Sequence, residues 1–536
     1  MEKSPATLHG AQRDTSPWAP LAQPLFRTIW IATLVSNIGT WMHDVGAAWL
    51  MTTLAPTPIM VSLVQAATTL PMFLFALPAG ALADIVDRRR LLILAQCLML
   101  IAATTLGLLQ FLGLVTPAVL LLATFVLGLG AALNAPPFQA IVPELVSRED
   151  LSPAVALNSL GVNIARAIGP ALGGAIVAVA GPGAVFVLNG LSVLGVLVVL
   201  ARWRRGPRSG ALPPERFIGA LQAGFRYARR SPDLHTVLLR AGAVFVFASA
   251  TWALLPLIAR QELGLGAGGY GILLGCVGSG AVFGALVLPR FRRRASADAV
   301  IAAATSLLAL AAIGFACLHS FPAACGTAFL AGAGWIAALS TLNIAAQMAL
   351  PNWVKARTLA VYLVVFNGSM AGGSALWGAV ATRWDIPAAL TLAAGGQLLA
   401  LLLVRRRRLP TQLPNLEPSL HWPVPATASD PELERGPVLV TVEYLVPAEH
   451  ATAFIAAMDE MRRIRHRDGA TLWRLFEDTA RPGRWIEFFE LDTWVEHLRQ
   501  HERVTEADRA TQERIRNFHA GSAPPAVSHL VAPPRK

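Results

Sequence analysis

Long apolar segments recur along the chain from about residue 26 to residue 404, with short polar stretches between them. Each has roughly the ~20 residues that an α-helix needs to cross the hydrocarbon core of a bilayer. Prolines and charges interrupt the pattern, as in "NAPPFQAIVPELVSREDLSP", because proline breaks a helix interior. The pattern predicts twelve membrane-spanning helices, at about 26–50, 58–82, 91–112, 117–135, 154–180, 184–202, 236–259, 269–289, 297–318, 323–346, 358–381 and 386–404.

Two stretches of the chain share one frame: "GALADIVDRRR" begins at Gly80 and "GALVLPRFRRR" begins at Gly284. They follow the second and the eighth predicted helices. A further echo links "NAPPFQAIVPELV" after the fourth helix to "NIAAQMALPNWV" after the tenth. Such offsets are typical of two parallel six-helix repeats related by an axis along the membrane normal. We therefore expect an all-α membrane region of two halves, residues 25–202 and 236–408, joined by a central loop at 203–235.

Basic residues cluster in the loops on one side of these helices. If the N-terminal tail, residues 1–24, is cytoplasmic, the loops that hold nearly all the arginines are cytoplasmic too, whereas the opposite loops hold little beyond Arg260 and Arg383. Cytoplasmic loops of membrane proteins carry an excess of Lys and Arg. The tail also lacks the apolar centre of a cleavable signal. These features predict a multi-pass protein of the plasma (inner) membrane with both termini in the cytoplasm.

The composition agrees with a chain whose main partner is the lipid bilayer. Hydrophobic residues make up 54% of it and charged residues 14%, against roughly 25% charged residues in a soluble domain. The formal net charge of +12 comes from clusters that flank apolar runs, so we expect no nucleic-acid partner. A Gly-rich phosphate loop does not occur, so ATP-driven transport is unsupported. The four cysteines lie in or beside apolar runs and are interpreted as buried thiols.

The last part of the chain is different in character. A Pro-rich stretch, residues 409–436, is typical of a semi-rigid linker. Within residues 437–531, alternating strands and periodic helices follow the order β-α-β-β-α-β, with one long helix in "DTWVEHLRQHERVTEADRATQERIRNFH". This order predicts a small, ferredoxin-like α+β domain that is soluble and cytoplasmic. We expect it to act as a regulatory or dimerising module.

Two histidines of that long helix, His497 and His501, are four residues apart and therefore share one helix face. This spacing suits a metal site, but the sequence offers no obvious third ligand. We interpret both as core or surface histidines and predict neither a metal ion nor a cofactor.

With twelve helices and two repeats, the chain resembles the major facilitator superfamily of transporters. The superfamily's loop motif after the second helix has a glycine, an acid four residues later and a basic cluster. Here the matching residues are Gly80, Asp84, Arg88, Arg89 and Arg90. The resemblance implies a gating loop, in which Gly80 permits close helix approach and Asp84 pairs with arginines or a helix end. Ile85 and Asp87 depart from the motif, which usually has a basic residue and a glycine there.

The fifth predicted helix contains "IARAIGPALGG", which resembles the antiporter motif of drug and siderophore exporters. Its motif residues are Gly169, Pro170, Gly173 and Gly174. A coupling role and plain helix packing are equally open interpretations, because small residues allow tight packing and proline allows a kink. The basic residue that such exporters often place in the fourth helix is replaced by Thr124. This departure argues against a standard proton-antiport mechanism.

Within the superfamily, the chain resembles the enterobactin-exporter-like group of secretion permeases, through "LVSNIGTWMHDVGAAWLM", "NAPPFQAIVPELV" and its C-terminal appendage. The tail also resembles dimeric α+β domains of the antibiotic-biosynthesis-monooxygenase type, through "TWVEHLRQHERV". The resemblance implies proton-coupled efflux of a small amphipathic metabolite by alternating access, with protons as coupling ion. Two alternatives stay open: a tail that is a cofactor-independent oxygenase modifying the cargo, and a transporter-derived sensor that moves nothing.

Charged groups inside a bilayer are costly, so each is a candidate functional residue. Asp44, beside His43, lies in the outer half of the first helix and suits a proton-titrated carboxylate facing a central cavity; the alternative is a paired or wet residue near the interface. Arg166 in the fifth helix is expected to face the cavity, where it either binds anionic cargo or pairs structurally, for example with Asp44. The candidate cavity-lining amides, each of which could instead bond between helices, are Asn37, Asn163, Asn343, Gln347 and Asn367.

Overall fold

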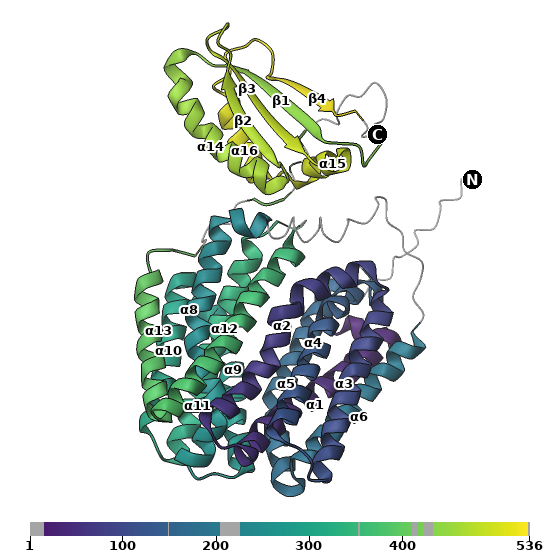
Figure 1. Cartoon of the computed structure of the whole chain (residues 1–536), viewed down its shortest axis with the longest axis vertical. Helices are drawn as coiled ribbons and strands as arrows, with labels where there is room; N and C mark the ends of the chain where they lie inside the picture. The colour runs from purple at the N-terminus through teal and green to yellow at the C-terminus, as the bar shows by residue number, and fades with distance from the viewer. Residues whose placement is uncertain are drawn as a thin grey trace, which may run out of the picture.

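The computed structural model describes residues 16–147, 149–203, 226–351, 354–409, 415–417, 419, 421–422 and 432–533. Most of the predicted central loop and Pro-rich linker, and nearly all of the N-terminal tail, lie outside these residues. Two regions are described: a bundle of long helices, and a small domain with a β-sheet that sits at one end of it (Figure 1).

Twelve long helices occur in the described part of the bundle, one for each predicted segment. Eleven of them are long and apolar enough to cross a membrane. The exception is α1, which is 31 residues long but carries several polar residues in its centre. The helices are α1 (Pro24–Leu54), α2 (Pro58–Ile85), α3 (Arg88–Phe111), α4 (Pro117–Leu145), α5 (Leu151–Ala180), α6 (Pro182–Arg202), α8 (Pro232–Leu257), α9 (Ala267–Arg292), α10 (Ala297–Cys317), α11 (Phe321–Met348), α12 (Lys355–Arg383) and α13 (Ile386–Val404).

Local sequence explains where many of these helices begin. Several have proline in their first turn, where the missing backbone N–H is not needed. The side chain of Asp87 caps α3 by accepting a hydrogen bond from the backbone of Arg90. Large apolar side chains point outward, as on α3, where Leu94, Ile101 and Leu108 recur every seven residues and are each at least 60% exposed. Such a stripe is stable only against lipid or another apolar surface.

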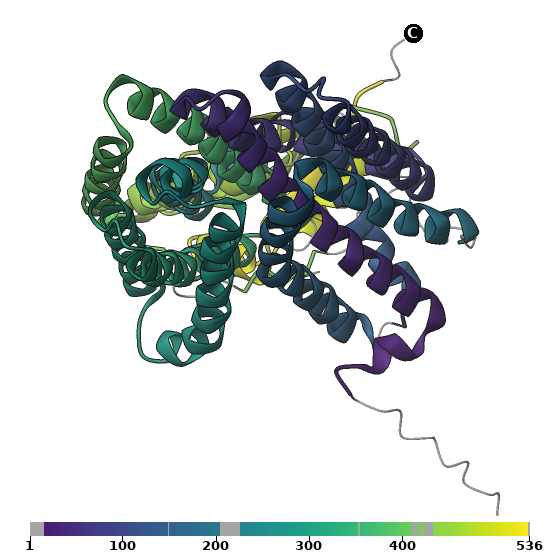
Figure 2. The same cartoon turned by 90° about the horizontal axis from the view of Figure 1, so that it is seen from below.

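The helices form two six-helix halves. Figure 2 views the bundle from the end away from the small domain, with the first half in purple and blue and the second in teal and green. We call this end of the bundle, where α1 ends and α2 begins, the distal end, and the end beside the small domain the proximal end. The largest buried apolar cluster is at the distal end and contains residues of both halves, for example Leu50, Val185, Leu254 and Leu273.

Near the proximal end the buried clusters are separate. One, around Phe26, Leu92 and Ile141, contains only residues of the first half. The other, around Phe245 and Leu342, contains only residues of the second half. The two halves thus share a core at the distal end and keep their own cores at the proximal end.

The small domain has a four-stranded antiparallel sheet with the strand order β2-β3-β1-β4. Its strands are β1 (Val438–Leu445), β2 (Leu472–Glu477), β3 (Arg484–Leu491) and β4 (Ala526–Val531), and its helices are α14 (Ala451–Asp468), α15 (Trp494–Arg503) and α16 (Glu506–Arg516). Alternate residues of β1 and β3 are buried against the helices. The order agrees with the predicted ferredoxin-like domain.

The predicted single long helix is wrong: it is divided into α15 and α16 at Val504. Thr505 forms a capping box with Asp508, because each side chain bonds the backbone N–H of the other residue. This arrangement satisfies donors at the start of α16 and favours a new helix over a continuous one.

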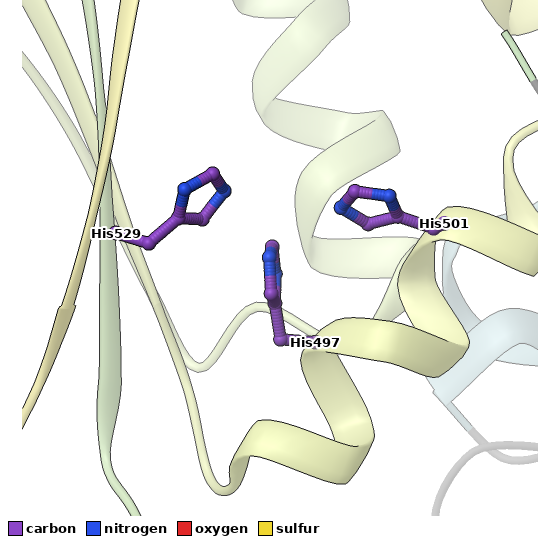
Figure 3. Close-up of side chains that lie close together, drawn as sticks. All are labelled: His497, His501 and His529. Atoms are coloured by element: carbon purple, nitrogen blue, oxygen red, sulfur yellow. The ribbon is translucent and has the colours of Figure 1, made fainter. Parts of the chain in front are cut away.

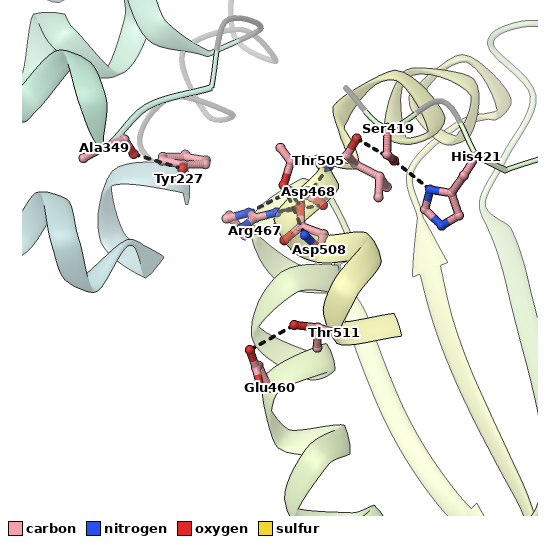
Figure 4. A network of polar contacts seen from close by, with 11 residues as sticks. Tyr227, Ala349, Ser419, His421, Glu460, Arg467, Asp468, Thr505, Asp508 and Thr511 are labelled. Carbon is pink, nitrogen blue, oxygen red and sulfur yellow. Dashed lines mark hydrogen bonds and ion pairs between the residues drawn. The ribbon is translucent and has the colours of Figure 1, made fainter. Parts of the chain in front are cut away.

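A polar junction joins the small domain to the bundle at the proximal end (Figure 4). The guanidinium of Arg467, at the end of α14, lies over the ring of Tyr227 at 5.6 Å. The hydroxyl of Tyr227 donates to the carbonyl of Ala349, just after α11, at 3.3 Å. Arg467 also bonds the carboxylates of Asp468 and Asp508. The last turn of α14 is therefore linked to the end of a bundle helix.

Candidate functional site

The distal end is closed by contacts between α1 and the short π-helical segment Ile258–Glu262 that extends α8. Arg260 in this segment donates to the hydroxyls of Thr52 and Thr53 at 2.9 and 2.6 Å. Its guanidinium also lies over the ring of Trp49 at 5.5 Å, and Trp49 stacks on Tyr270 of α9 at 6.0 Å. We call these residues the distal latch. The sequence pattern had singled out Arg260 only as a rare basic residue on this side.

The antiporter-like motif of α5 packs against two helices at once. Additional Cβ atoms on Gly169 and Gly173 would meet α1, at 2.6 Å from Trp41 and 2.8 Å from Met42. Pro170 lies between them and is buried.

Gly174 instead faces the second half. A Cβ atom there would lie 2.5 Å from the Cα atom of Gly271 in α9, and one on Gly271 would lie 2.7 Å from the Cα atom of Gly174. One on Gly278 would lie 3.1 Å from the Cα atom of Ala167. The structure thus favours the packing interpretation of the motif, and it shows that the packing joins the two halves as well as α5 to α1.

A second seam between the halves runs along α2 and α12. Near its distal end the backbone N–H of Ile59 donates to the hydroxyl of Thr382 at 3.0 Å. Further along, a Cβ atom on Gly378 would lie 2.6 Å from the Cβ atom of Ser62. Near the middle of α2, Phe73 packs against Gly368. The contacts of this seam lie between the distal end and the middle of the helices, in agreement with the shared core there.

Asp44 and His43 are adjacent in sequence but face different neighbours. His43 is 2% exposed and packs against Phe186 of α6, with ring centroids 4.6 Å apart. Neither of its ring nitrogens has a hydrogen-bond partner among the described residues. Asp44 is half-buried on α1, between Trp41, which packs against Gly169 of α5, and Trp49 of the distal latch. The structure therefore places Asp44 between the α5 contact and the latch, and His43 inside the first half.

Arg166 is half-buried near the middle of α5, beside the crossing with α9. Its guanidinium lies over the ring of Trp41 at 5.7 Å. Within the described residues, it forms no ion pair with Asp44, so the structural pair considered from the sequence is wrong. A cation held on an aromatic face retains free N–H donors for another ligand.

The candidate amides divide into two groups. Asn163 and Asn367 donate to backbone carbonyls of their own helices, those of Ser159 and Leu363 at 2.9 and 2.8 Å. Asn37, Asn343 and Gln347 are half-buried. An intrahelical bond occupies one amide donor, so the second group has more capacity for a ligand.

The arginines of the predicted gating loop hold the first half together. Arg88 donates to the carbonyl of Ala140 at 3.1 Å and forms an ion pair with Glu144 at 2.9 Å. Arg89 donates to the last carbonyls of α6, which is a favourable position for a cation. Arg90 is exposed. The side chain of Asp84 lies outside the described part of the structure.

The predicted close helix approach at Gly80 is wrong for this conformation, because a Cβ atom there would meet nothing within 4 Å. The corresponding Gly284 of the second half packs tightly against Ala333 and Ile336 of α11. The two copies of the frame therefore differ in their packing, and only the first is open.

The small domain contains a cavity of about 860 Å³ between its sheet and its helices. Its walls include Trp422, Tyr444 and Phe489, together with Arg465, which is paired with the buried Glu487 at 2.9 Å. His497, His501 and His529 also line it. The sequence offered no obvious third ligand for His497 and His501, but in the structure β4 brings His529 beside them. The signal lay in "AVSHLV", where His529 shares one face of the last strand with Val527 and Val531.

Two pseudo-equivalent six-helix halves that share a core at one end define a membrane transport protein of the major facilitator type. The chain matches the transmembrane secretion effector family over residues 15–536, and it belongs to that family. It is 29% identical over 408 residues to the enterobactin exporter EntS of Shigella boydii serotype 18 and to that of Escherichia coli O139:H28. Each match covers 72% of this chain and 93% of the relative.

Solved structures share the fold at low sequence identity. A bacterial homologue of the human lysosomal transporter Spinster, inward-facing and unoccupied, has a TM-score of 0.54 at 16% identity and covers 71% of this chain and 93% of its own. A bacterial homologue of the iron transporter ferroportin, also inward-facing, has a TM-score of 0.56 at 15% identity, and the match covers 71% of this chain and 97% of that one. The nucleoside transporter NupG (D323A mutant) has a TM-score of 0.60 at 11% identity, with 71% of this chain and 99% of that one covered.

Proposed function

We propose that the protein is a secondary active exporter that moves a small amphipathic metabolite out of the cytoplasm by alternating access, driven by protons. The observation that carries this proposal is the asymmetry of the bundle: the halves share a core and the distal latch at one end, and keep separate cores at the other. A transporter that closes on one side of a central site needs such an arrangement.

The orientation follows from charge. Arg88, Arg89 and Arg90 lie at the proximal end, as do the arginines that follow α9. By the positive-inside rule the proximal end, the small domain and both termini face the cytoplasm of a plasma (inner) membrane. The distal latch then faces outward, and the conformation described is inward-open. The openness around Gly80 supports this assignment, because a cytoplasmic gate is unpacked in that state.

Asp44 is the residue we assign to proton coupling. It lies on α1, five residues before Trp49 of the distal latch. Among the described residues no cation pairs with it. An ionised carboxylate without a partner is unfavourable when water is excluded, so the closed state favours the protonated form of Asp44. Opening of the latch to water lowers that cost. Protonation and gate movement are therefore linked.

Arg166 and Trp41 suit an anionic, aromatic cargo. The guanidinium offers donors that match carboxylates and catecholates, and the adjacent ring offers a stacking surface. The curated relatives are named as exporters of enterobactin, which supports a siderophore-like compound as the first candidate. Asn37, Asn343 and Gln347 would complete such a site.

Proteoliposomes test the coupling. With enterobactin as probe and a pH-sensitive dye inside, we expect probe-dependent proton movement in the wild type and none with Asp44→Asn. Asp233→Asn, an exposed acid in the first turn of α8, is the matched control and should behave as the wild type. Probe movement that does not depend on a proton gradient would remove protons from the mechanism. Normal coupling in Asp44→Asn would remove Asp44.

A further inference from the structure

Three histidines of the small domain converge from two elements that are distant in sequence. His497 and His501 project from one face of α15, and His529 projects toward them from β4 (Figure 3). The ring centroid of His497 lies 4.8 Å from that of His501 and 4.8 Å from that of His529. One nitrogen from each ring lies within 4.8 Å of one from each of the others.

Buried imidazole nitrogens without hydrogen-bond partners lower the stability of the fold unless a ligand binds them. His497 is 1% exposed, and neither of its ring nitrogens has a hydrogen-bond partner among the described residues, although Gln500 lies beside it. Leaving a buried polar atom unpaired destabilises the fold. His501 and His529 are half-buried. The cluster therefore has unused lone pairs that point into a common space.

The burial of the rings favours their neutral form. Burial, followed by the charges of His501, His529 and Arg465, lowers the pKa of His497 to about 3. Burial, with the charges of His529, Arg465 and His421, lowers the pKa of His501 to about 4. Neutral imidazole is the form that binds a metal ion.

The surrounding charge does not exclude a cation. Arg465 lines the same cavity, but Glu487 accepts hydrogen bonds from it at 2.9 and 3.4 Å, and this ion pair has no net charge. On the cavity wall Glu513 is paired in the same way with Arg509 of α16 at 2.8 Å, and Arg516 adds one cation at the end of that helix.

We propose that His497, His501 and His529 form a binding site for a divalent late transition-metal ion. Three imidazoles are a ligand set that suits zinc, copper, iron and nickel rather than magnesium or calcium. Metal–nitrogen bonds of about 2.0–2.1 Å in a tetrahedral site place the nitrogens about 3.4 Å apart, so side-chain rotation must close the cluster by about 1.4 Å. The fourth position opens into the cavity, where water or an oxygen donor of a small molecule binds.

The full-length protein in detergent provides the test, purified with a tag free of histidine and stripped with a chelator. We expect one Co²⁺ per chain, with the visible absorption of a tetrahedral site, and displacement of Co²⁺ by Zn²⁺. His501→Gln and His529→Gln should each weaken binding on the order of 100-fold or more, and together they should abolish the absorption. His319→Gln, an exposed histidine after α10, is the matched control and should leave binding unchanged.

Thermal unfolding of the metal-free proteins separates loss of a ligand from loss of the fold. The variants should unfold near the wild type without metal, and only wild type and control should gain stability when Zn²⁺ is added. Absence of binding in the wild type, or full binding in the double variant, would overturn the proposal. If a variant unfolds early, His529→Asn, which keeps a polar side chain in the strand, takes its place in the same titration.

Discussion

The crossing of α5 and α9 gives the most direct way to shift the bundle between its two states. In the closed distal seam, a Cβ atom on Gly174 would lie 2.5 Å from the Cα atom of Gly271. Ordinary contact requires 3.4–4 Å, so Gly174→Ala forces the two helices apart by about 1 Å. Overpacking of this kind costs about 1–3 kcal/mol. When the halves separate at the distal end, the methyl group has room, so the cost falls on the distal-closed state alone.

We therefore expect Gly174→Ala to shift the equilibrium toward the distal-open state by a factor of about 5–150. Alanine also has a higher helix propensity than glycine, but this difference stabilises both states equally and therefore does not change the equilibrium between them. Gly275→Ala is the matched control: it adds the same methyl group to the same α5–α9 crossing, where its Cβ atom would lie 3.7 Å from that of Ala171.

Distances between spin labels report this shift. Leu114 and His319 are exposed in distal loops of the first and second half, and they can carry the labels once the four native cysteines are replaced. We expect a longer distance to gain population in Gly174→Ala and the wild-type distribution in Gly275→Ala. An unchanged distribution in Gly174→Ala, or an equal change in both variants, would refute the assignment of this crossing as the closed seam.

Three further predictions concern the distal latch and the small domain. Arg260→Ala removes the hydrogen bonds to α1 and should give the same change in label distance as Gly174→Ala, whereas a wild-type distribution would exclude Arg260 from the latch. Because burial lowers the pKa values of His497 and His501 to about 3 and 4, the unfolded metal-free domain binds protons below about pH 6.5 that the folded one does not. The free energy of unfolding is then highest above pH 6.5 and decreases as the pH is lowered, by up to about 1.4 kcal/mol per unit for the buried His497. Hydrogen exchange of the first strand between pH 7 and 5 measures this once each rate is divided by the intrinsic amide exchange rate at the same pH, and protection factors that stay constant or rise in acid would contradict it. Glu487→Gln leaves Arg465 buried without a counter-charge and should lower the free energy of unfolding of the small domain by about 3–5 kcal/mol, whereas replacing both residues with apolar ones should restore much of that stability. Equal hydrogen-exchange rates in the single and double variants would show that the unpaired charge is not the cause.

The architecture could largely be predicted from the sequence because its signals are local or repeated. Helix length, apolar composition and the frame shared by Gly80 and Gly284 are visible in the chain without knowledge of any contact. The sequence of strands and helices along the small domain likewise follows from alternation and helical periodicity. The break between α15 and α16 had a visible signal, since Thr505 and Asp508 have the spacing of a capping box, but the helical periodicity on both sides concealed it.

The candidate sites could be predicted only in part, because they depend on pairs distant in sequence. The pattern identified Asp44 and Arg166 as charged groups within membrane helices and Gly174 as part of a small-residue motif. It contained no information that Trp41 would face Arg166 or that Gly271 would face Gly174. In the small domain, His529 joins the other histidines through the pairing of β4 with β1.

Export itself is tested most directly by deleting the gene and comparing cells with spent medium by untargeted mass spectrometry, in iron-poor and iron-rich growth. The account predicts a compound that accumulates inside the deleted cells and disappears from their medium, with both changes reversed by the wild-type gene and not by Asp44→Asn. If no compound changes its distribution, or if an unmodified precursor appears while its oxidised product is missing, the protein is not the exporter described above.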